Sequence, residues 1–513
     1  MSETLRVATD VRHPQYDYME SASGETYTND QPGVWTQMQD CFDGQRTIKA
    51  RGQAYLPMSP GLRNQKDTTK ANNSYLYYKH NASFPEVLRR FVSSMCGLWF
   101  QSETKYELPD NLAPIVESAT TDDKTIHSVE WTIARSQAVE GRIGILCEPD
   151  SSQTGTVPPD LVVYGARSII NWQTVYDYLS QKERILPGFT RMYYTDGGTK
   201  YGAKFVVLDE TFVDYLGDET IAYRVLALDF AGNYYTATFD ENYNIDDFDP
   251  DYPDFENIIY PSIAGKKLKF IPFTVINSDT VGFDVRQPAL KPVSDGALSI
   301  YNKDALLQQA LQISAQPFVF FGGFSDDAME NIGMLGSTVS ISSPQADSHV
   351  EYVESQGSAI TPLREEIAAQ YIMIEKFGVE LMDSGTESGA ALTIRVDVKT
   401  ASLKEMALVR GEGMEDILIN CILMMNPAMK REAANELISV DVNNEFKGEI
   451  ASVEQLRIYL DMLYGKKLTE REYHDLLYKA GVVTEEDYDV RQSELERDAN
   501  LTPLVSETGT DNE

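Results

Sequence analysis

Cysteine is scarce in this chain, and its placement excludes two kinds of architecture. The 513 residues contain four cysteines, with no CxxC pair and no spacing typical of a metal site: Cys41, Cys96, Cys147 and Cys421. A small disulfide-stapled fold and a zinc module both require cysteines that lie closer together in the sequence. We therefore expect reduced, partly buried thiols in a protein made in the cytoplasm.

Histidine and the short motifs of common enzymes are also scarce. The five histidines show no local catalytic or metal-binding spacing: His13, His80, His127, His349 and His474. The chain lacks a GxxxxGK[S/T] phosphate loop, a GxSxG nucleophile turn, an HExxH zinc motif and a glycine-rich dinucleotide turn. Lys266 and Lys267 follow Gly265 without the upstream glycine loop of a phosphate cradle. The sequence thus predicts no catalytic residue, no metal and no cofactor.

Long apolar runs are absent as well. No stretch approaches the ~20 consecutive apolar residues of a membrane span. Residues 1–5 do not form a basic region followed by an apolar run, which a signal peptide would require. We expect no signal peptide, no membrane span and no membrane partner.

Basic residues are few relative to acidic ones. Lys and Arg total 44 against 79 Asp and Glu, which gives a formal net charge of −35 at pH 7. This excess argues against a protein that grips nucleic acid through its phosphates, although DNA could still slide past such a surface. A solubilising surface on a secreted or salt-adapted protein would explain the charge equally well.

The remaining composition is that of a globular protein long enough for several domains, with 42% hydrophobic and 24% charged residues. Its clearest pattern begins with a helix that follows Pro288 and Pro292 and runs to about Ala315. One face of this helix is mostly apolar: Val293, Ala297, Ile300, Tyr301, Leu307 and Leu311. Asp304 interrupts that face, so it is either a buried charge that needs a partner or part of a helix–helix seam in an oligomer. We favour the seam.

A small β module follows this helix. Residues 318–321, followed by Gly322 and Gly323, predict a strand that enters a turn. Residues 338–341 and 349–353 continue the β pattern, and Gly357 closes it. The aromatic residues that mark the module are Phe318, Phe320, Phe321 and Tyr352.

A second helix begins after the β module. Thr361 is a suitable N-cap, Pro362 sits where its missing N–H is tolerated, and Glu365 and Glu366 complement the helix dipole. Apolar residues then recur at steps of four and three, with only Gln370 polar in the series: Leu363, Ile367, Ile374, Phe377 and Leu381. This seam requires another helix against it. We expect it, together with Asp304, at the contact between subunits of a closed oligomer.

A short loop of small and polar residues interrupts the helical pattern after the second helix. Glycine and these residue types favour turns and leave little side chain to pack. The predicted loop residues are Asp383, Ser384, Gly385, Thr386, Glu387, Ser388 and Gly389.

The third helix of this region starts by about Lys399. Its apolar residues have a spacing like that of a coiled coil: Leu403, Ala407, Met414, Ile417, Cys421 and Met424. Gly411 and Gly413 lie in its interior, where each costs about 1 kcal/mol relative to alanine and is tolerated where a kink is useful. We therefore predict a long kinked helix.

The N-terminal half combines helices with a β-rich part. Apolar spacing predicts helices at about 35–42, 84–100 and 122–139, and a period of two predicts strands at 143–147, 161–164, 204–208, 223–228, 234–239 and 270–276. Residues 240–254 form an acidic run that partly resembles a calcium loop. Ile245 stands where such a loop needs glycine, and Asp251 stands where it needs glutamate. We favour a solvated loop.

The order of these elements resembles a known family. Paired helices around a small β module, a Gly/Ser/Thr loop and a long helix are similar to the stem, clip, stem and tunnel loop of portal proteins of tailed bacteriophages. Residues in the N-terminal half are similar to a portal-like phage family known mostly as a domain of unknown function: Trp35, Asp40, Gly44, Ile48, Lys49, Gly52, Tyr55, Leu56, Pro57 and the stretches 141–145 and 169–172. The resemblance covers roughly residues 30–430 and includes no catalytic motif.

This resemblance implies an α+β, multi-domain portal-like fold. The implied divisions are a flexible N-terminal arm (1–30), a wing with a helical shoulder and a β-rich part (31–287), a stem helix (288–316), a clip (317–358), a second stem helix (359–383), a tunnel loop (384–395), a long kinked helix (396–425), a helical crown (426–499) and a disordered tail (500–513).

The resemblance also implies a function without hydrolysis by the chain itself. Such a protein forms a ring, typically of twelve copies, at one vertex of the virion capsid, after assembly in the host cytoplasm. Double-stranded DNA passes through the ring during packaging and ejection. Its partners are the terminase large subunit, head–tail adaptor and tail proteins, and the capsid and scaffold proteins.

Two other functions remain open from the residues alone. Paired carboxylates are abundant in so acidic a chain, so an acidic β-rich polysaccharide hydrolase is one alternative. A tail or baseplate component of a virion is the other.

Overall fold

The structure is a computed structural model of the chain. It describes residues 12–20, 32–64, 66–149, 154–178, 202–213, 217–240, 251, 253, 257–315, 318–323, 347–353, 359–378, 389–444, 453–465, 467–479, 483 and 488–493. Side chains are not described at several of these positions, including 375–378 and 389–401.

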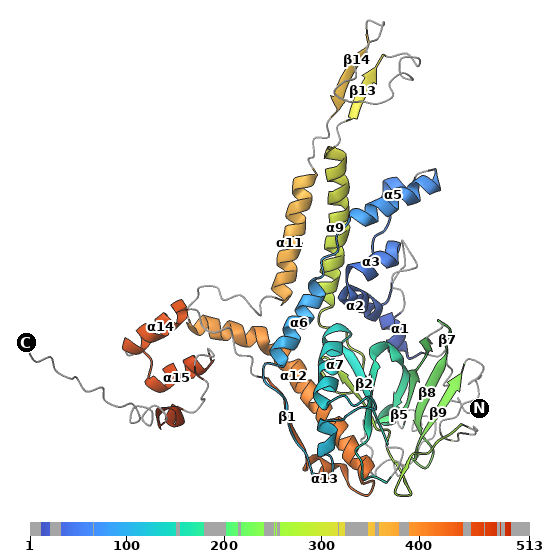
Figure 1. Cartoon of the computed structure of the whole chain (residues 1–513), viewed down its shortest axis with the longest axis vertical. Coiled ribbons are helices and arrows are strands. Elements are labelled where there is room, and N and C mark those ends of the chain that lie inside the picture. Colours follow the sequence, from blue (N-terminus) through green and yellow to red (C-terminus); the bar gives the residue numbers. More distant parts are fainter. Residues whose placement is uncertain are drawn as a thin grey trace, which may run out of the picture.

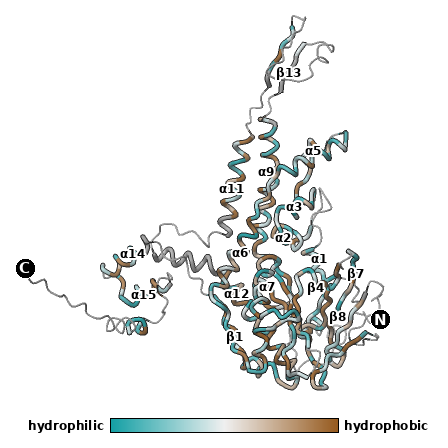
Figure 2. Tube along the Cα trace, viewed as in Figure 1, coloured by the Kyte–Doolittle hydropathy of each residue, from teal (hydrophilic) through white to brown (hydrophobic). Residues whose placement is uncertain are grey.

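A long arm projects from a body of helices and sheets (Figure 1). The arm consists of α9 (Lys291–Ala315) and α11 (Ile360–Gly378), which lie side by side. A hairpin of β13 (Phe318–Gly322) and β14 (His349–Val353) lies beyond their far ends. Hydrophobic residues concentrate in the body (Figure 2). The mixture of helix and strand confirms the predicted α+β class.

The N-terminal helices lie beside the arm and on the body (Figure 1). They are α1 (Pro14–Glu20), α2 (Val34–Asp43), α3 (Gln45–Arg51), α4 (Pro60–Arg63), α5 (Thr68–Asn81), α6 (Val87–Trp99) and α7 (Ile126–Val139). Of these, α2, α5 and α6 contact α9. One core joins α2, α6 and α7 to α9 and includes Met38, Trp99 and Tyr301. The predicted start of α7 near Asp122 is wrong, because the helix begins at Ile126 after Thr125, whose side chain caps it.

Helix α1 corrects the prediction of a flexible arm over residues 1–30. Tyr16 and Met19 on α1 are buried in the body. The His13 ring stacks on Trp172 at 4.0 Å between ring centroids, and the His13 N–H donates to the Ile170 carbonyl. Residues 12–20 are therefore held by their own chain and need no neighbour to order them.

Two antiparallel sheets form the β-rich part of the body. Their strand orders are β12-β2-β3 and β4-β5-β8-β9. The strands are β2 (Arg142–Glu148), β3 (Asp160–Gly165), β4 (Ile169–Thr174), β5 (Ala203–Asp209), β8 (Ala222–Leu228), β9 (Tyr234–Asp240) and β12 (Phe273–Asn277). The six predicted strands correspond to six of these, and β4 was not among the predictions. Two short hairpins, β6 (Phe212–Val213) with β7 (Glu219–Thr220) and β10 (Ser262–Ile263) with β11 (Lys266–Lys267), flank the sheets.

The central strand β2 is buried on both faces, unlike a strand with one solvated face. Helices α7 and α12 (Gly389–Met425) both contact β2, and α12 also contacts β12. Gly144 on β2 has no room for a side chain, since an added Cβ would lie 2.4 Å from Cζ of Phe273. The contacts of α12 with β2 and β12 hold this helix against the sheet.

The acidic run does not behave as a uniformly solvated loop. Residues 241–250 lie outside the described residues, but Asp251 is buried and pairs with Lys204 Nζ at 2.8 Å. The Tyr178 hydroxyl donates to the second carboxylate oxygen of Asp251. Asp251 is therefore a core residue that anchors the end of this run, and the predicted solvated loop is wrong at this position.

The chain returns to the body after α12. Helix α13 (Arg431–Asn435) contacts α12, and β15 (Ser439–Asp441) pairs with β1 (Lys105–Glu107). Residues up to about 444 thus pack on the body, which corrects the predicted crown that starts at residue 426. Helices α14 (Val453–Tyr464) and α15 (Glu470–Lys479) contact each other and lie away from the body in Figure 1.

All four cysteines are free and buried, as expected for reduced thiols. Burial raises the pKa of Cys41 to about 12 and that of Cys96 to about 11. The sulfur atoms of Cys147 and Cys421 lie 3.7 Å apart between β2 and α12.

No helix within the described ranges is both long enough and apolar enough to cross a membrane.

Candidate functional site

The arm is built from two helices that pack closely along one face. An added Cβ on Gly296 of α9 would lie 2.7 Å from Cγ1 of Ile374 on α11, so glycine lets the two helices approach each other here. Farther along the arm, Lys303 Nζ lies 2.7 Å from Glu366 Oε1. These two contacts fix the relative height of the helices, because they join α9 to α11 at two levels.

The predicted seam on α11 faces α9 of the same chain. Ile374 is buried, and Leu363 and Ile367 are half-buried, whereas most residues between them are exposed. The side chain of Phe377 lies outside the described part of the chain. A partner helix exists, as the pattern required, but it comes from the same subunit. A role of these residues between subunits stays a prediction.

Asp304 has partners within its own chain and is only half-buried. Its carboxylate accepts a hydrogen bond from the Ser83 N–H at 2.7 Å and one from Gln308 Nε2 at 3.2 Å. It is therefore neither a fully buried charge nor a residue that needs a second subunit for a partner. It ties α9 to the segment that precedes α6.

One flank of the arm contains an open pocket of about 420 Å³, which we call the socket. Its lining residues come from α9, α11 and the segment before α6: Ser83, Phe84, Pro85, Ile300, Asp304, Leu307, Arg364, Ile367, Ala368 and Tyr371. Most of these side chains are apolar. Asp304 and Arg364 are the charged groups among them.

Two cationic side chains outside the lining, Lys49 and Arg90, act on residues of the socket. Burial lowers the pKa of Lys49 and Asp304 opposes this effect, so Lys49 lies within electrostatic reach of the socket. Burial and then Asp304 raise the pKa of Tyr371, whereas Arg90 lowers it. Lys49 and Arg90 are therefore close enough to act electrostatically on Asp304 and Tyr371, which both line the socket.

The opposite flank of the arm is an exposed ridge. Its residues follow helical spacing on both helices: Lys303 and Leu306 on α9, and Glu366, Ala369 and Met373 on α11. Leu306 is 43% and Met373 47% exposed, which makes them solvent-facing apolar side chains on an otherwise polar flank. The hydrogen bond from Lys303 lowers the pKa of Glu366, so the carboxylate stays charged.

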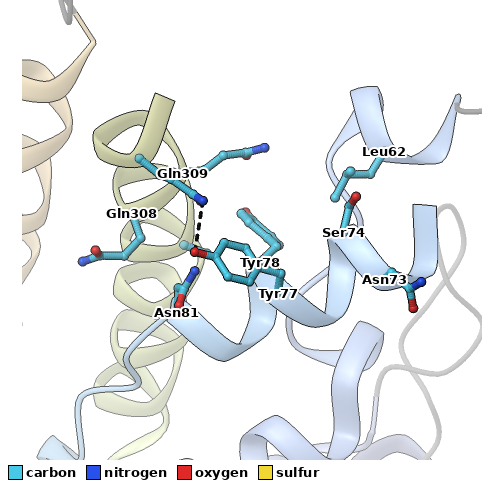
Figure 3. Close-up of a pocket in the computed structure, with 10 residues that line it drawn as sticks. Leu62, Asn73, Ser74, Tyr77, Tyr78, Asn81, Gln308 and Gln309 are labelled. Carbon is cyan, nitrogen blue, oxygen red and sulfur yellow. Dashed lines mark hydrogen bonds between the residues drawn. The ribbon is translucent and has the colours of Figure 1, made fainter. Parts of the chain in front are cut away.

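A second pocket, of about 530 Å³, lies between α5 and α9 (Figure 3). Amide and hydroxyl side chains dominate its lining: Leu62, Asn73, Ser74, Tyr77, Tyr78, Asn81, Ala305, Gln308, Gln309 and Gln312. Gln312 Nε2 donates to the Tyr77 hydroxyl at 3.0 Å. The lining contains no carboxylate, histidine, lysine or cysteine, so its polar groups are amides and hydroxyls that can form hydrogen bonds.

The predicted β module forms the tip of the arm. In the hairpin, Phe318 pairs with Val353, Phe320 with Glu351, and Val319 with Tyr352. Phe318, Phe320 and Phe321 lie on β13 and Tyr352 lies on β14, so the strands contain the four predicted aromatic residues. Residues 338–341, predicted as a further strand, lie outside the described part.

The predicted tunnel loop lies almost entirely outside the described residues. Asp383 to Ser388 are not described, and Gly389 is the first residue of α12. The helix therefore starts about ten residues before the predicted Lys399, which corrects the loop boundary at residue 395. A glycine start and small residues after it mask the beginning of this helix in the sequence.

The buried carboxylates in the body form ion pairs and hydrogen bonds within the core. Glu130 pairs with Arg410, Asp251 with Lys204, and Asp40 accepts hydrogen bonds from Arg51 and Tyr55. Burial raises the pKa of Glu140, whose carboxylate accepts the Ala166 N–H. Within the residues that the structure covers, no group of three or more His, Cys, Asp or Glu side chains is placed to hold a metal ion.

Sequence reasoning missed the two flanks of the arm. The apolar pattern identified the face of α11 that packs on α9, but it did not distinguish Leu306 and Met373 from core residues. Asp304 was a usable signal for the socket, since a charged residue within an apolar helix face indicates that part of this face is not in the core. The segment around Ser83 could not be placed there from spacing, because it lies 221 residues from Asp304.

Comparison with known proteins gives a family match over part of the chain. Residues 293–425 match the model of a domain of unknown function, DUF4055, so the match covers the arm and α12. No curated protein matches the chain.

Two solved structures are similar to this chain at low sequence identity. One is described as the virion of a native gene transfer agent particle, and the other as the neck of an empty gene transfer agent particle computed with C6 symmetry. Each match has 10% identity and a TM-score of 0.32, and covers 76% of this chain and 88% of the other.

Proposed function

We propose that this chain is a portal-type ring subunit of a phage-like virion. In this role, about twelve copies surround a channel at one capsid vertex, and DNA passes through the channel during packaging and ejection. The ring is a structural and transport element that performs no hydrolysis itself. Its partners are the terminase large subunit, head–tail adaptor and tail proteins, and capsid and scaffold proteins.

The observation that carries this proposal is the construction of the arm. Two antiparallel helices extend from the body, carry a hairpin at their far end, and lead through residues 379–388 into the long helix α12 (Figure 1). This is the order of stem, clip, stem, tunnel loop and long helix that the resemblance implies. The arm also has two open flanks. Identical copies could use these flanks to contact one another around a central axis.

The charge supports a channel that does not hold DNA tightly. A formal charge of −35 repels phosphates, so a duplex that passes the protein forms no strong static contact over most of its surface. The carboxylates that are buried in the described core are engaged by cations, hydroxyls or backbone N–H groups. Their engagement favours a structural role over that of a carboxylate-based hydrolase.

Ring formation is the direct test of the proposed function. Purified protein at micromolar concentration and moderate salt is expected to form closed particles of about twelve subunits. Mass measurement by analytical ultracentrifugation gives the copy number, and electron microscopy shows whether end-on views are rings. A species that stays monomeric under these conditions contradicts the proposal, and open fibres or other assemblies favour a tail or baseplate component.

The loop that joins α11 to α12 provides a second test. We propose that Asp383 to Ser388, with Gly389 at the start of α12, lie inside the channel, where Glu387 repeated around the ring would form an acidic circle next to the duplex. Deletion of Thr386 to Ser388 is expected to leave ring assembly intact and to impair DNA packaging or retention. Assembly and packaging are measured separately, and unaltered packaging by intact rings contradicts the channel position.

A further inference from the structure

We propose that the ridge of one copy docks into the socket of the next copy, so that the chains assemble head to tail through the flanks of their arms. This inference rests on the proposed function and names the contact that would build the ring. The occupant of the socket is a second copy of this chain. The socket stays an open pocket in the single chain because the side chains that fill it belong to the neighbour.

The two surfaces lie on opposite flanks of the same two-helix unit. On α9 the socket uses Ile300, Asp304 and Leu307, whereas the ridge uses Lys303 and Leu306. These two sets interleave at three- and four-residue steps, so each set follows its own stripe along the helix. On α11 the socket uses Arg364, Ala368 and Tyr371, while the ridge uses Glu366, Ala369 and Met373. One copy therefore presents both halves of the contact and cannot join them within itself.

The two surfaces also lie at the same height along the arm. Leu306 of the ridge is adjacent in sequence to Leu307 of the socket, and the ion pair of Lys303 with Glu366 is level with Asp304. A rotation about an axis parallel to the arm moves each flank sideways without changing its height. It therefore brings the ridge of one copy to the level of the socket in the next, which is the geometry of a heterologous contact that closes into a ring.

Charge favours the same pairing. Residues 45–90, which include α3, α5 and the socket segment 83–85, contain nine basic and two acidic side chains, a formal charge of +7. The remainder of the chain carries −42, because the total is −35. The basic segment lies beside α9, and its Lys49 and Arg90 act on socket residues. The neighbouring copy is acidic over most of its chain and is attracted to this basic flank, whereas the Lys303–Glu366 pair on its ridge is neutral and contributes little.

The chemistry of the ridge fits the socket. Leu306 and Met373 are flexible, exposed apolar side chains, and the socket lining is mostly apolar. Methionine adapts to irregular apolar surfaces, and leucine gains free energy by leaving water. Docking would cover both apolar side chains.

Two single variants test the two halves separately. Leu306→Glu places a charge on the ridge, and Ala368→Trp fills the socket with a large side chain from its own subunit. Each is expected to raise the protein concentration needed for half-maximal assembly at least about tenfold, as loss of a central interface contact does. The matched control is Leu437→Glu, which alters a leucine of similar exposure, 46%, on the body, and should assemble as the parent does. Circular dichroism and thermal unfolding verify that each variant is folded.

A mixture of the two variants reports the direction of the contact. Leu306→Glu copies keep an intact socket, and Ala368→Trp copies keep an intact ridge. A head-to-tail contact predicts that the mixture forms pairs with one intact interface and no larger species. If the ridge instead meets a second ridge, Ala368→Trp alone will assemble normally, and the proposal is then wrong.

A covalent trap provides a readout that does not depend on weakened assembly. The double variant Leu306→Cys/Ala368→Cys places one thiol on each flank, where the two cannot meet within one subunit. The native cysteines are all buried. Mild oxidation should yield a ladder of linked subunits on a non-reducing gel, up to the closed ring, and each single variant should yield none.

The outcomes separate this inference from the proposed function. If the parent protein forms rings but the variants assemble normally and no ladder appears, the ridge and socket are not the contact, while the ring proposal stands. If the parent protein forms no closed particles, the proposed function itself fails.

Discussion

Replacement of Arg410 by alanine is expected to lower the free energy of unfolding by about 3–5 kcal/mol. Arg410 on α12 and Glu130 on α7 form an ion pair with both side chains 0% exposed, and Arg410 Nε lies 3.1 Å from Glu130 Oε1. Removal of the arginine would leave a carboxylate buried without its cation. Urea unfolding, followed by tryptophan fluorescence, measures the change.

The surroundings of this pair explain the size of the effect. Glu130 also accepts hydrogen bonds from Thr104 Oγ1 at 2.8 Å and from the Tyr106 hydroxyl at 2.9 Å. The Arg410 guanidinium lies over the rings of Trp99 and Phe100, at 5.0 and 5.2 Å from their centroids. Burial lowers the pKa of Arg410, and Glu130 opposes that shift. The pair therefore joins α6, α7 and β1 to α12, the helix that carries the connection from the arm.

A partly exposed ion pair provides the control for Arg410→Ala. Lys291 and Asp295 on α9 are 2.6 Å apart, with side chains 24% and 49% exposed. Lys291→Ala is expected to cost at most about 0.5 kcal/mol, because water solvates both charges when the pair is broken. The double variant Glu130→Gln/Arg410→Met should recover much of the loss, since neither change leaves an isolated charge. Equal effects of Arg410→Ala and Lys291→Ala would refute the argument.

A second large effect is expected at Gly413, where an alanine should destabilise the protein by about 1–3 kcal/mol. An added Cβ would lie 2.4 Å from Cδ1 and 2.6 Å from Cγ1 of Ile276, a buried residue of β12. This clash outweighs the gain of about 1 kcal/mol that alanine brings over glycine in a helix. Glycine is required here because α12 approaches the sheet closely.

Gly411 in the same helix is the control. It tests whether glycine is needed for the close approach of α12 to the sheet or for flexibility of the helix. An added Cβ there would lie 3.2 Å from Cγ2 of Val442, which follows β15 and is not part of a sheet. Gly411→Ala should therefore change stability little. The double variant Gly413→Ala/Ile276→Ala should be less destabilised than the sum of its parts, because the new methyl group enters the space left by Ile276. If both glycine variants stabilise the protein, the glycines serve a kink rather than the contact.

These variants address assembly as well as stability. Arg410 and Gly413 fix α12 to the body, and α12 leads from the connection at residues 379–388. In the proposed ring, a subunit whose α12 is displaced would present its arm at a changed angle to its neighbours. Ring closure requires a constant angle between copies, so these variants should yield irregular assemblies even where folding is retained.

Local patterns in the sequence predicted the elements of the arm. Helices α9 and α11 and strands β13 and β14 correspond closely to the ranges expected from apolar spacing, because helix and strand periods depend on near neighbours in the chain. The same holds for the strands of the body sheets that alternate or run apolar between turns. Helix starts were less accurate, as α7 and α12 show, since caps and small residues give weak local signals.

The tertiary structure alone decided what covers each face and why certain residues are needed. The apolar spacing of Leu363 and Ile367 by itself required a partner helix, but only the fold showed that this partner is α9 of the same chain. Glu130 and Arg410 are 280 residues apart, and Gly413 meets a residue of a distant strand. Asp304 accepts a hydrogen bond from the Ser83 N–H, and no spacing rule in the sequence relates these two residues. The periodicity of apolar residues indicates which face of a helix or strand is buried. Which segment covers that face depends on packing between segments that are remote in the sequence.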